Sequence, residues 1–309
     1  MSKRPLIAVV GATATGKTDT AIALAEALDG EVVSADAYQV YRGLDIGTAK
    51  VSPELRARVP HHLLDIAAPG DQITLARFLD AANEALEDVW SRGKLPLLTG
   101  GSGQYVWALL EGWNVPRVPP DTALRAELET LAAREGNAAL VARLAEVDAE
   151  AAGRLDPENP RRLIRAIEVV IREGRPLAAC QTRSPIDADV LIIGLRLPRE
   201  TLYARLDART DAMYEAGFLD EVSNLRAQGF GETAAVRGAV GYKEISQHLD
   251  GEFDLQEAIR RHKNANHRLV RRQDAWFKET DPRIRWLDAG PDAGARCVAL
   301  AREWLQSNR

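Results

Sequence analysis

A glycine-bounded segment near the amino terminus, Gly11–Thr18 (GATATGKT), limits the folds open to this chain. It follows the apolar run 6–10 and leads into residues 20–28, whose apolar positions have helical spacing. A glycine-rich loop that connects a buried strand to the start of a helix is the arrangement in which phosphate loops occur. The loop amides, the helix amino terminus and the lysine face phosphate oxygens, and the final hydroxyl can hold magnesium. We therefore predict a bound di- or triphosphate, held by Gly11, Thr13, Ala14, Thr15, Gly16, Lys17 and Thr18, with Mg2+ at Thr18.

The composition is that of an ordinary globular protein. The chain has 309 residues, 46% hydrophobic and 28% charged, enough for two domains or one elaborated domain. No apolar run approaches the ~20 residues of a membrane helix, and the first strand begins too early for a signal peptide. Cys180 and Cys297 are isolated and fit neither a disulfide framework nor a metal motif. We expect a cytoplasmic protein with no membrane partner.

Two basic clusters contrast with the net charge of −5. Residues 260–278 hold seven Lys or Arg against one acid, Asp274, and six arginines lie between Arg154 and Arg175. An acidic protein with local basic faces can dock a polyanion such as nucleic acid at one place. A solvated helix face is the alternative interpretation of each cluster.

An aspartate follows the second expected strand, residues 31–34. Ligands of open α/β sheets collect at the carboxyl ends of the strands, so Asp36 falls near the phosphate-loop ligand. This position favours a catalytic or metal role, with a turn cap as the alternative. The loop 44–50 carries a hydroxyl, a glycine and a lysine, which suit another oxygen-rich group.

The loop after the third expected strand, residues 94–99, lacks an acidic residue. Kinases and ATPases of the phosphate-loop class usually place one there to hold the magnesium of the nucleotide. Residues 100–105 instead offer three glycines, which leave space for a second ligand, and Ser102, which can donate to it. The pair His61-His62 has no further ligands nearby in the sequence, so we expect no metal site there.

The rest of the chain is mainly helical in spacing. Residues 121–184 form a helical insertion before the strand 189–195, and a long helix over 201–228 places Arg205 and Arg209 on one face. Two arginines so placed can clamp a pyrophosphate or form surface salt bridges. We predict an α/β fold: a phosphate-loop NTPase-like parallel sheet core (1–118 and 186–309), a helical insertion domain (119–185) and basic C-terminal helices.

Taken together, the motifs resemble those of the tRNA dimethylallyltransferases, in the bacterial form without a cysteine-histidine finger. The resemblance covers residues 6–277. It rests on an ordered set: GATATGKT (11–18), SAD (34–36), QVY (39–41), DIGTAK (45–50), PHHL (60–63), GGSG (100–103), RLIRAIEV (162–169), GYKE (241–244), RQ (272–273) and WF (276–277).

The resemblance implies transfer of a dimethylallyl group from dimethylallyl diphosphate to the exocyclic N6 amine of the adenosine 3′-adjacent to the anticodon, tRNA position 37. Pyrophosphate is released with the help of Mg2+. It also implies that Asp36 acts as general base, that the Ser102 hydroxyl assists and that Arg209 steadies the pyrophosphate. The partner implied is the anticodon arm of tRNA, and we expect a monomer. The contacts implied are Gln39, Lys50, Arg161, Arg162, Arg165, Lys243, Arg268, Arg271, Arg272 and Gln273.

The chain departs from the family pattern at a few positions. Ser102 stands where Thr is usual, Gln104 where Leu or Met is common, Ala12 where Pro is usual, and His267-Arg268 where an Arg-Gln pair is frequent. Three alternatives stay open: prenylation of free AMP or ADP, a small-molecule kinase, and a non-catalytic RNA-binding module. The insertion and the basic terminus argue against a mononucleotide acceptor, which needs neither.

Overall fold

The chain forms two compact units in the computed structural model, which describes residues 3–308. The core unit runs to Leu109 and resumes at Asp187, and the helical unit spans Leu110–Ile186. Among the described residues, no helix has the length and apolar character needed to span a bilayer.

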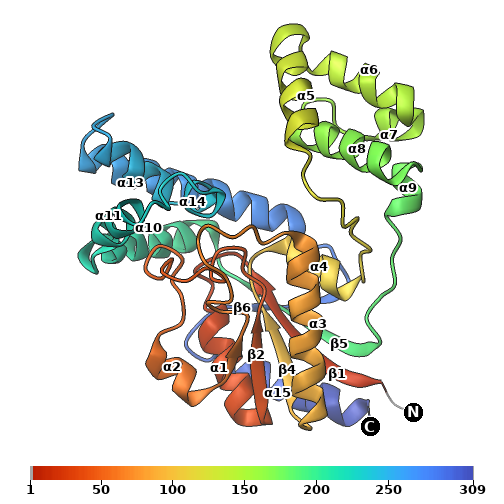
Figure 1. Ribbon diagram of the computed structural model, residues 1–309. Helices are drawn as coiled ribbons and strands as arrows, with labels where there is room; N and C mark the ends of the chain where they lie inside the picture. Colours follow the sequence, from red (N-terminus) through yellow and green to blue (C-terminus); the bar gives the residue numbers. More distant parts are fainter. Residues whose placement is uncertain (1–2, 309) are drawn as a thin grey trace. The chain divides into compact units, whose positions relative to one another are not determined.

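The core unit is built on a sheet of six parallel strands in the order β3-β2-β4-β1-β5-β6 (Figure 1). Residues Leu6–Val10 of the central β1 are fully buried, as expected of a parallel strand covered on both faces. The α/β fold with a parallel sheet predicted from the sequence is confirmed. The strands are β1 (Arg4–Gly11), β2 (Gly30–Ser34), β3 (His61–His62), β4 (Leu95–Thr99), β5 (Ala188–Arg196) and β6 (Ile284–Asp288).

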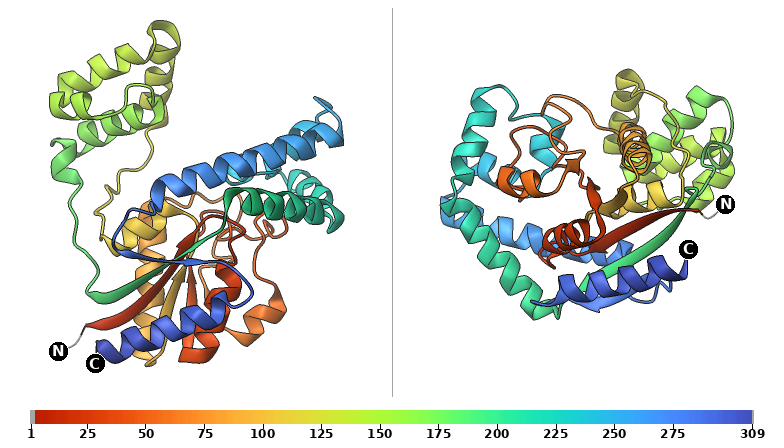
Figure 2. Two further views of the ribbon diagram at one scale, coloured as in Figure 1. Left: turned by 180° about the vertical axis from the view of Figure 1, so that it is seen from behind. Right: turned by 90° about the horizontal axis from the view of Figure 1, so that it is seen from below.

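Helices cover both faces of this sheet. Ile7 and Val9 share one hydrophobic cluster with α1 and α15, which pack against each other, and α3 covers the opposite face (Figure 2). The helices of this unit are α1 (Lys17–Leu28), α2 (Pro53–Arg58), α3 (Leu75–Ser91), α4 (Gly103–Leu110), α10 (Arg199–Glu215), α11 (Phe218–Ala227), α12 (Ala234–Gly238), α13 (Tyr242–Leu249), α14 (Leu255–Trp276) and α15 (Ala293–Ser307).

Three local expectations need correction. The single helix expected over 201–228 is two helices, α10 and α11, because Gly217 adopts φ +95° and ends the helical path between them. The glycine loop after β4 is shorter than expected, since α4 already begins at Gly103. The carboxyl-terminal helix α15 has no counterpart in the sequence-based prediction.

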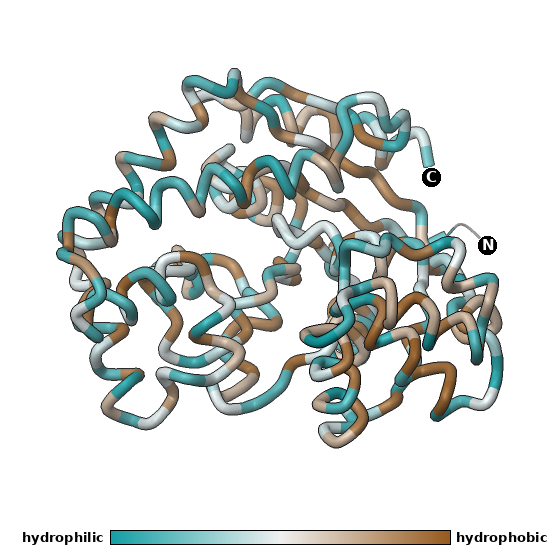
Figure 3. The backbone as a smooth tube through the Cα atoms, turned by 90° about the horizontal axis from the view of Figure 1, so that it is seen from above, coloured by the Kyte–Doolittle hydropathy of each residue, from teal (hydrophilic) through white to brown (hydrophobic). Residues whose placement is uncertain are grey.

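The helical unit contains five helices around a small core of its own. Leu163 and Ile167 of α8 are fully buried in this core, whereas Arg161 and Arg162 are exposed. Figure 3 shows hydrophilic and hydrophobic residues alternating along the helices, as expected of helices with one buried face. The five are α5 (Thr122–Glu135), α6 (Asn137–Val147), α7 (Ala149–Arg154), α8 (Pro160–Glu173) and α9 (Leu177–Cys180).

Candidate active site

The phosphate loop has the backbone geometry that its glycines predict. Gly11, Ala14 and Gly16 have φ values of +137°, +69° and +88°. A Cβ on Gly11 would lie 2.4 Å from the backbone oxygen of Leu195, so only glycine fits there. The buried Thr15 hydroxyl donates to the Ala12 carbonyl at 2.8 Å and braces the loop from inside.

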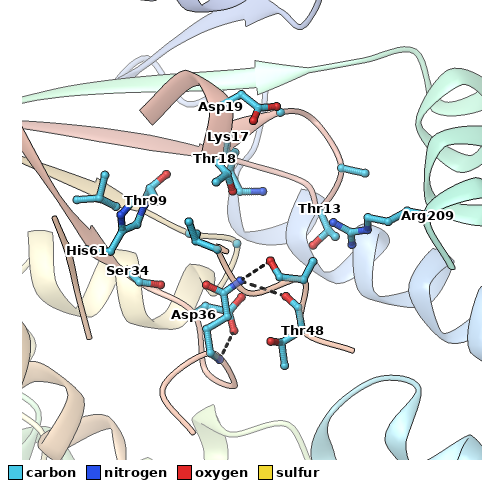
Figure 4. Close-up of a pocket in the computed structure, with 18 of the residues that line it drawn as sticks. Thr13, Lys17, Thr18, Asp19, Ser34, Asp36, Thr48, His61, Thr99 and Arg209 are labelled. Atoms are coloured by element: carbon cyan, nitrogen blue, oxygen red, sulfur yellow. Dashed lines mark hydrogen bonds between the residues drawn. The ribbon is translucent and has the colours of Figure 1, made fainter. Parts of the chain in front are cut away.

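This loop forms one wall of a cavity of about 370 Å³ in the core unit (Figure 4). The other walls come from the ends of β2 and β4, from the loops after them and from α10. Its lining residues are Thr13, Ala14, Gly16, Lys17, Thr18, Asp19, Val32, Ser34, Asp36, Gln39, Thr48, Ala49, Val51, His61, Thr99, Gly100, Gly101, Arg205 and Arg209.

Besides the exposed Arg205, two cations with little access to solvent line this cavity, Lys17 and Arg209, and holding their charge without an anion is costly. Burial, with a smaller contribution from Arg209, lowers the pKa of Lys17 to about 7, while Asp36 opposes the shift. Burial also lowers the pKa of Arg209, again opposed by Asp36. The Lys17 ammonium donates to the Ala12 carbonyl at 2.7 Å, a neutral acceptor. The cavity therefore offers positive charge to an anionic ligand.

Asp36 lies at the same cavity and uses one carboxylate oxygen to hold its own loop. Its Oδ1 accepts the amides of Tyr38 at 2.9 Å and Gln39 at 3.2 Å. Within residues 3–308, no hydrogen bond occupies Oδ2. The turn-cap and functional interpretations are thus compatible, because one oxygen caps the turn and the other remains available as a proton acceptor.

The predicted hydroxyl of Ser102 lies beside this loop and not in the cavity lining. Its Oγ accepts the amide of Ala37 at 3.1 Å, next to Asp36 in the chain. The glycine loop and the Asp36 loop are thereby tied together. Gly11 and Thr15 likewise lie behind the cavity wall, whereas the other phosphate-loop residues predicted to bind diphosphate line the cavity.

The backbone of the loop 44–50 is hydrogen-bonded to one carboxylate that lies far away in the sequence. Glu221 accepts the amides of Asp45, Ile46 and Gly47 at 2.7–3.3 Å and the Tyr242 hydroxyl at 2.6 Å. A Cβ on Gly47 would lie 2.3 Å from the ring of Phe218, so the loop packs too closely for any side chain there. This packing places Thr48 and Ala49 at the cavity.

Several residues expected to contact tRNA are occupied within the protein. The side chain of Lys50 is only 1% exposed and forms ion pairs with Asp45 and Asp65. Arg165 binds the buried Glu168, and Gln273 is 6% exposed with its carboxamide bonded to the phosphate loop. Such burial does not support a direct RNA contact by Lys50 or Gln273.

Gln39 is engaged as well, since its side-chain Nε2 donates to the Thr48 carbonyl at 3.1 Å beside the cavity. The remaining predicted RNA contacts are exposed, and they lie on α8, α13 and α14. They are Arg161, Arg162, Lys243, Arg268, Arg271 and Arg272.

The structure adds residues that the sequence did not single out. Ser34 and Thr99 line the cavity at the ends of β2 and β4, and His61, which the sequence analysis considered only as a metal ligand, lines it at the start of β3. Burial lowers the pKa of His61, and its Nδ1 bonds the Val59 carbonyl at 2.7 Å, which leaves Nε2 as an acceptor. The positions of Ser34 and Thr99 at the carboxyl ends of parallel strands are the signal that could have identified these two.

The comparisons with known families agree with these motifs. Residues 39–280 match the family described as IPP transferase, and residues 5–59 match the family described as Isopentenyl transferase. A tRNA dimethylallyltransferase of Chloroflexus aurantiacus (strain ATCC 29366 / DSM 635 / J-10-fl) is 49% identical over 286 residues, 93% of this chain and 97% of the relative. One of Roseiflexus sp. (strain RS-1) is 46% identical over 304 residues, 98% and 99% of the two chains.

Solved structures are similar over almost the whole chain. The tRNA isopentenylpyrophosphate transferase of Bacillus halodurans has a TM-score of 0.72 at 37% identity and covers 99% of this chain and 97% of that one. A eukaryotic dimethylallyltransferase acting on tRNA has a TM-score of 0.83 at 25% identity, with 98% and 80% covered.

The fold, the cavity and these matches define a phosphate-loop enzyme of the transferase class. The family match spans most of the chain, and the similar relatives span nearly all of it. The chain belongs to the tRNA dimethylallyltransferase family, which confirms the resemblance found in its motifs.

Proposed function

We propose that this chain transfers a dimethylallyl group from dimethylallyl diphosphate to N6 of the adenosine at tRNA position 37 and releases pyrophosphate. One observation carries the proposal: Asp36 lines the same cavity as Lys17 and Arg209. A proton acceptor and two groups suited to a leaving anion thus face one ligand-sized space.

Asp36 would act on the incoming amine. The lone pair of an aromatic amine is delocalised into the ring, so the amine is a poor nucleophile until its proton is removed. As nitrogen bonds to the allylic carbon, the amine proton passes to Asp36 Oδ2. A positioned base of this kind contributes ~10²–10⁴-fold to the rate.

Lys17 and Arg209 would act on the departing group. The bond between the allylic carbon and the diphosphate oxygen breaks, and its electron pair stays on the pyrophosphate. Cations and loop amides fixed around that oxygen stabilise the charge as it develops. The phosphate loop then serves prenyl transfer, with no phosphoryl transfer.

The residues present fit Mg2+ held mainly by the ligand. Among the described residues, no cluster of three or more His, Cys, Asp or Glu could hold a metal alone. The Thr18 hydroxyl lines the cavity at the start of α1, and within residues 3–308 its side chain makes no hydrogen bond. Thr18 would hold the ion together with diphosphate oxygens and water, and the ion would neutralise diphosphate charge.

The RNA would be held by the exposed basic residues of the two units. Arg161 and Arg162 on α8 make no ion pair within the described residues, nor do Arg268 and Arg272 on α14. Contacts to phosphates offset the few kcal/mol needed to turn a base out of its stack. We expect a monomer that acts on the anticodon arm of tRNA in the cytoplasm.

The test is incubation of the protein with dimethylallyl diphosphate, Mg2+ and unmodified tRNA, followed by nucleoside mass analysis. The proposal expects one five-carbon unit on the adenosine of position 37 and little product with AMP or ADP. Preferred modification of AMP would establish the mononucleotide alternative. ATP consumption without a prenyl donor would establish a kinase, and tRNA binding without product would refute catalysis.

A further inference from the structure

Gln273 joins two loops of the cavity wall through its carboxamide. Its Oε1 accepts the amide of Thr13 at 2.8 Å, and its Nε2 donates to Thr13 Oγ1 and to the Gly101 carbonyl, both at 3.2 Å. Gln273 is buried, with 6% of the residue exposed. Thr13 lies 260 residues from Gln273 in the chain, and Gly101 lies 172 residues from it. Through this one side chain, α14 therefore links the phosphate loop to the glycine loop.

The end of α14 packs so closely against the glycine loop that no side chain fits at Gly101 or Gly103. A Cβ on Gly101 would lie 2.3 Å from Gln273 Nε2, and a Cβ on Gly103 would lie 2.3 Å from the Trp276 side chain. The Trp276 carbonyl also accepts the Trp107 indole N–H at 3.0 Å. The carboxyl-terminal end of α14 therefore rests directly on the glycine loop.

The hydrogen bonds also direct the Thr13 hydroxyl. Because Thr13 Oγ1 accepts from Gln273 Nε2, its own hydrogen is free to point elsewhere, and Thr13 lines the cavity. The Thr13 amide is already bonded to Gln273 and is not available to a ligand. Thr13 can thus offer a hydroxyl donor to a phosphate oxygen while its backbone stays fixed.

Other residues of α14 either pack against the core or face solvent. Val270 packs in a cluster with Ala12 and Leu206, under the phosphate loop, whereas the neighbouring Arg272 is exposed. The helix therefore turns one face to the loops of the cavity and a basic face to solvent. Gln273 belongs to the first of these faces.

We propose that Gln273 is a positioning residue for the diphosphate. It fixes the phosphate loop relative to the glycine loop and orients the Thr13 hydroxyl, and it makes no contact with RNA. This inference deepens the proposed function and rests on its assignment of the cavity to a diphosphate. Loss of the carboxamide should weaken diphosphate binding and leave tRNA affinity unchanged.

The test compares Gln273→Met, which keeps the length of the side chain without its hydrogen bonds, with Arg272→Met on the adjacent exposed position. Pyrophosphate with Mg2+ is titrated by calorimetry and unmodified tRNA by filter binding, at a temperature where all proteins are folded. We expect Gln273→Met to weaken pyrophosphate binding about tenfold, as one or two lost hydrogen bonds would. Its tRNA affinity should stay within about twofold of wild type, and Arg272→Met should show the opposite pattern.

Gly101→Ala provides a second route, because its new methyl would push the same carboxamide away from the other side. We expect this variant to lose pyrophosphate affinity, and to lose much less when Gln273→Ala has already removed the carboxamide. Wild-type pyrophosphate affinity in folded Gln273→Met or Gly101→Ala would overturn the inference, as would a loss confined to tRNA binding. A wild-type protein that binds pyrophosphate but transfers no prenyl group would refute the proposed function alone.

Discussion

Lys17 and Arg209 line one cavity, and within residues 3–308 neither forms an ion pair with a carboxylate. Burial lowers the pKa of both side chains, and the charge of Arg209 lowers the pKa of Lys17 further. Two cations kept together without a partner are preorganised for an anion. The predictions on this cavity follow from that arrangement.

Diphosphate binding should take up a proton at Lys17. With a pKa of about 7, part of the Lys17 population is neutral at neutral pH, and a bound anion favours the charged form. Pyrophosphate affinity should therefore fall as the pH rises above about 7. Calorimetry in buffers of different ionisation enthalpy measures the uptake. Lys17→Arg, which stays charged, should lack this component, and equal uptake by both proteins would contradict the assignment.

Arg209→Gln should lower the turnover rate by about 10²–10³-fold, the usual loss when one stabilising donor is removed from a reacting oxygen. Arg205 is the matched control, since it lies one turn earlier on α10 and lines the same cavity but is exposed. Arg205→Gln should cost less than about tenfold, because solvent screens an exposed charge. Similar single-turnover rates for the two variants would argue against a special role for Arg209.

Lys50→Met should destabilise the core unit without changing tRNA affinity. The Lys50 side chain is 1% exposed and its ammonium pairs with Asp45 and Asp65, so its removal leaves two carboxylates close together. We expect a loss of about 2 kcal/mol in urea denaturation, below the range for fully buried pairs because both aspartates reach solvent. Unaltered stability with weaker tRNA binding would instead support a direct RNA contact.

Acid should loosen the helical unit through Glu168. Burial alone would raise the pKa of this carboxyl, but hydrogen bonds from Arg125, the Asp121 amide and Arg165 lower it to about 2. A depressed carboxyl pKa stabilises the fold above the unfolded value of 4.5, and this contribution is lost as the pH falls toward about 2. Hydrogen exchange of α5 and α8, corrected for intrinsic rates, should show the loss. Glu168→Gln should remove this pH dependence, and an unchanged profile would count against the ion pair.

The sequence alone predicted the features that are encoded locally. The phosphate loop could be recognised because Gly11, Gly16 and Lys17 lie within one strand–loop–helix segment. Asp36 could be placed near the phosphate-loop ligand because it follows a strand of a parallel sheet, whereas the role of Arg209 came from the family resemblance, since its helical face alone also fitted surface salt bridges.

The features that were missed depend on distant partners. Nothing near Glu221 in the sequence shows that its side chain holds a loop 174–176 residues away, and nothing near Gln273 shows that its side chain holds two loops, 172 and 260 residues away. The sequence alone suggests that Lys50 is a surface cation, because its ion pair with Asp65 becomes apparent only in the structure. The break at Gly217 was missed because a single glycine is also tolerated within a helix.

The most direct test of the account is the single-turnover rate of Asp36→Asn with dimethylallyl diphosphate and tRNA. Asparagine keeps the Oδ1 acceptor for the amides of Tyr38 and Gln39, so the loop should stay folded while the base is lost. We predict a rate at least about 10²-fold lower with an unchanged tRNA affinity. A rate near that of wild type would contradict the central claim that the Asp36 carboxylate accepts the amine proton.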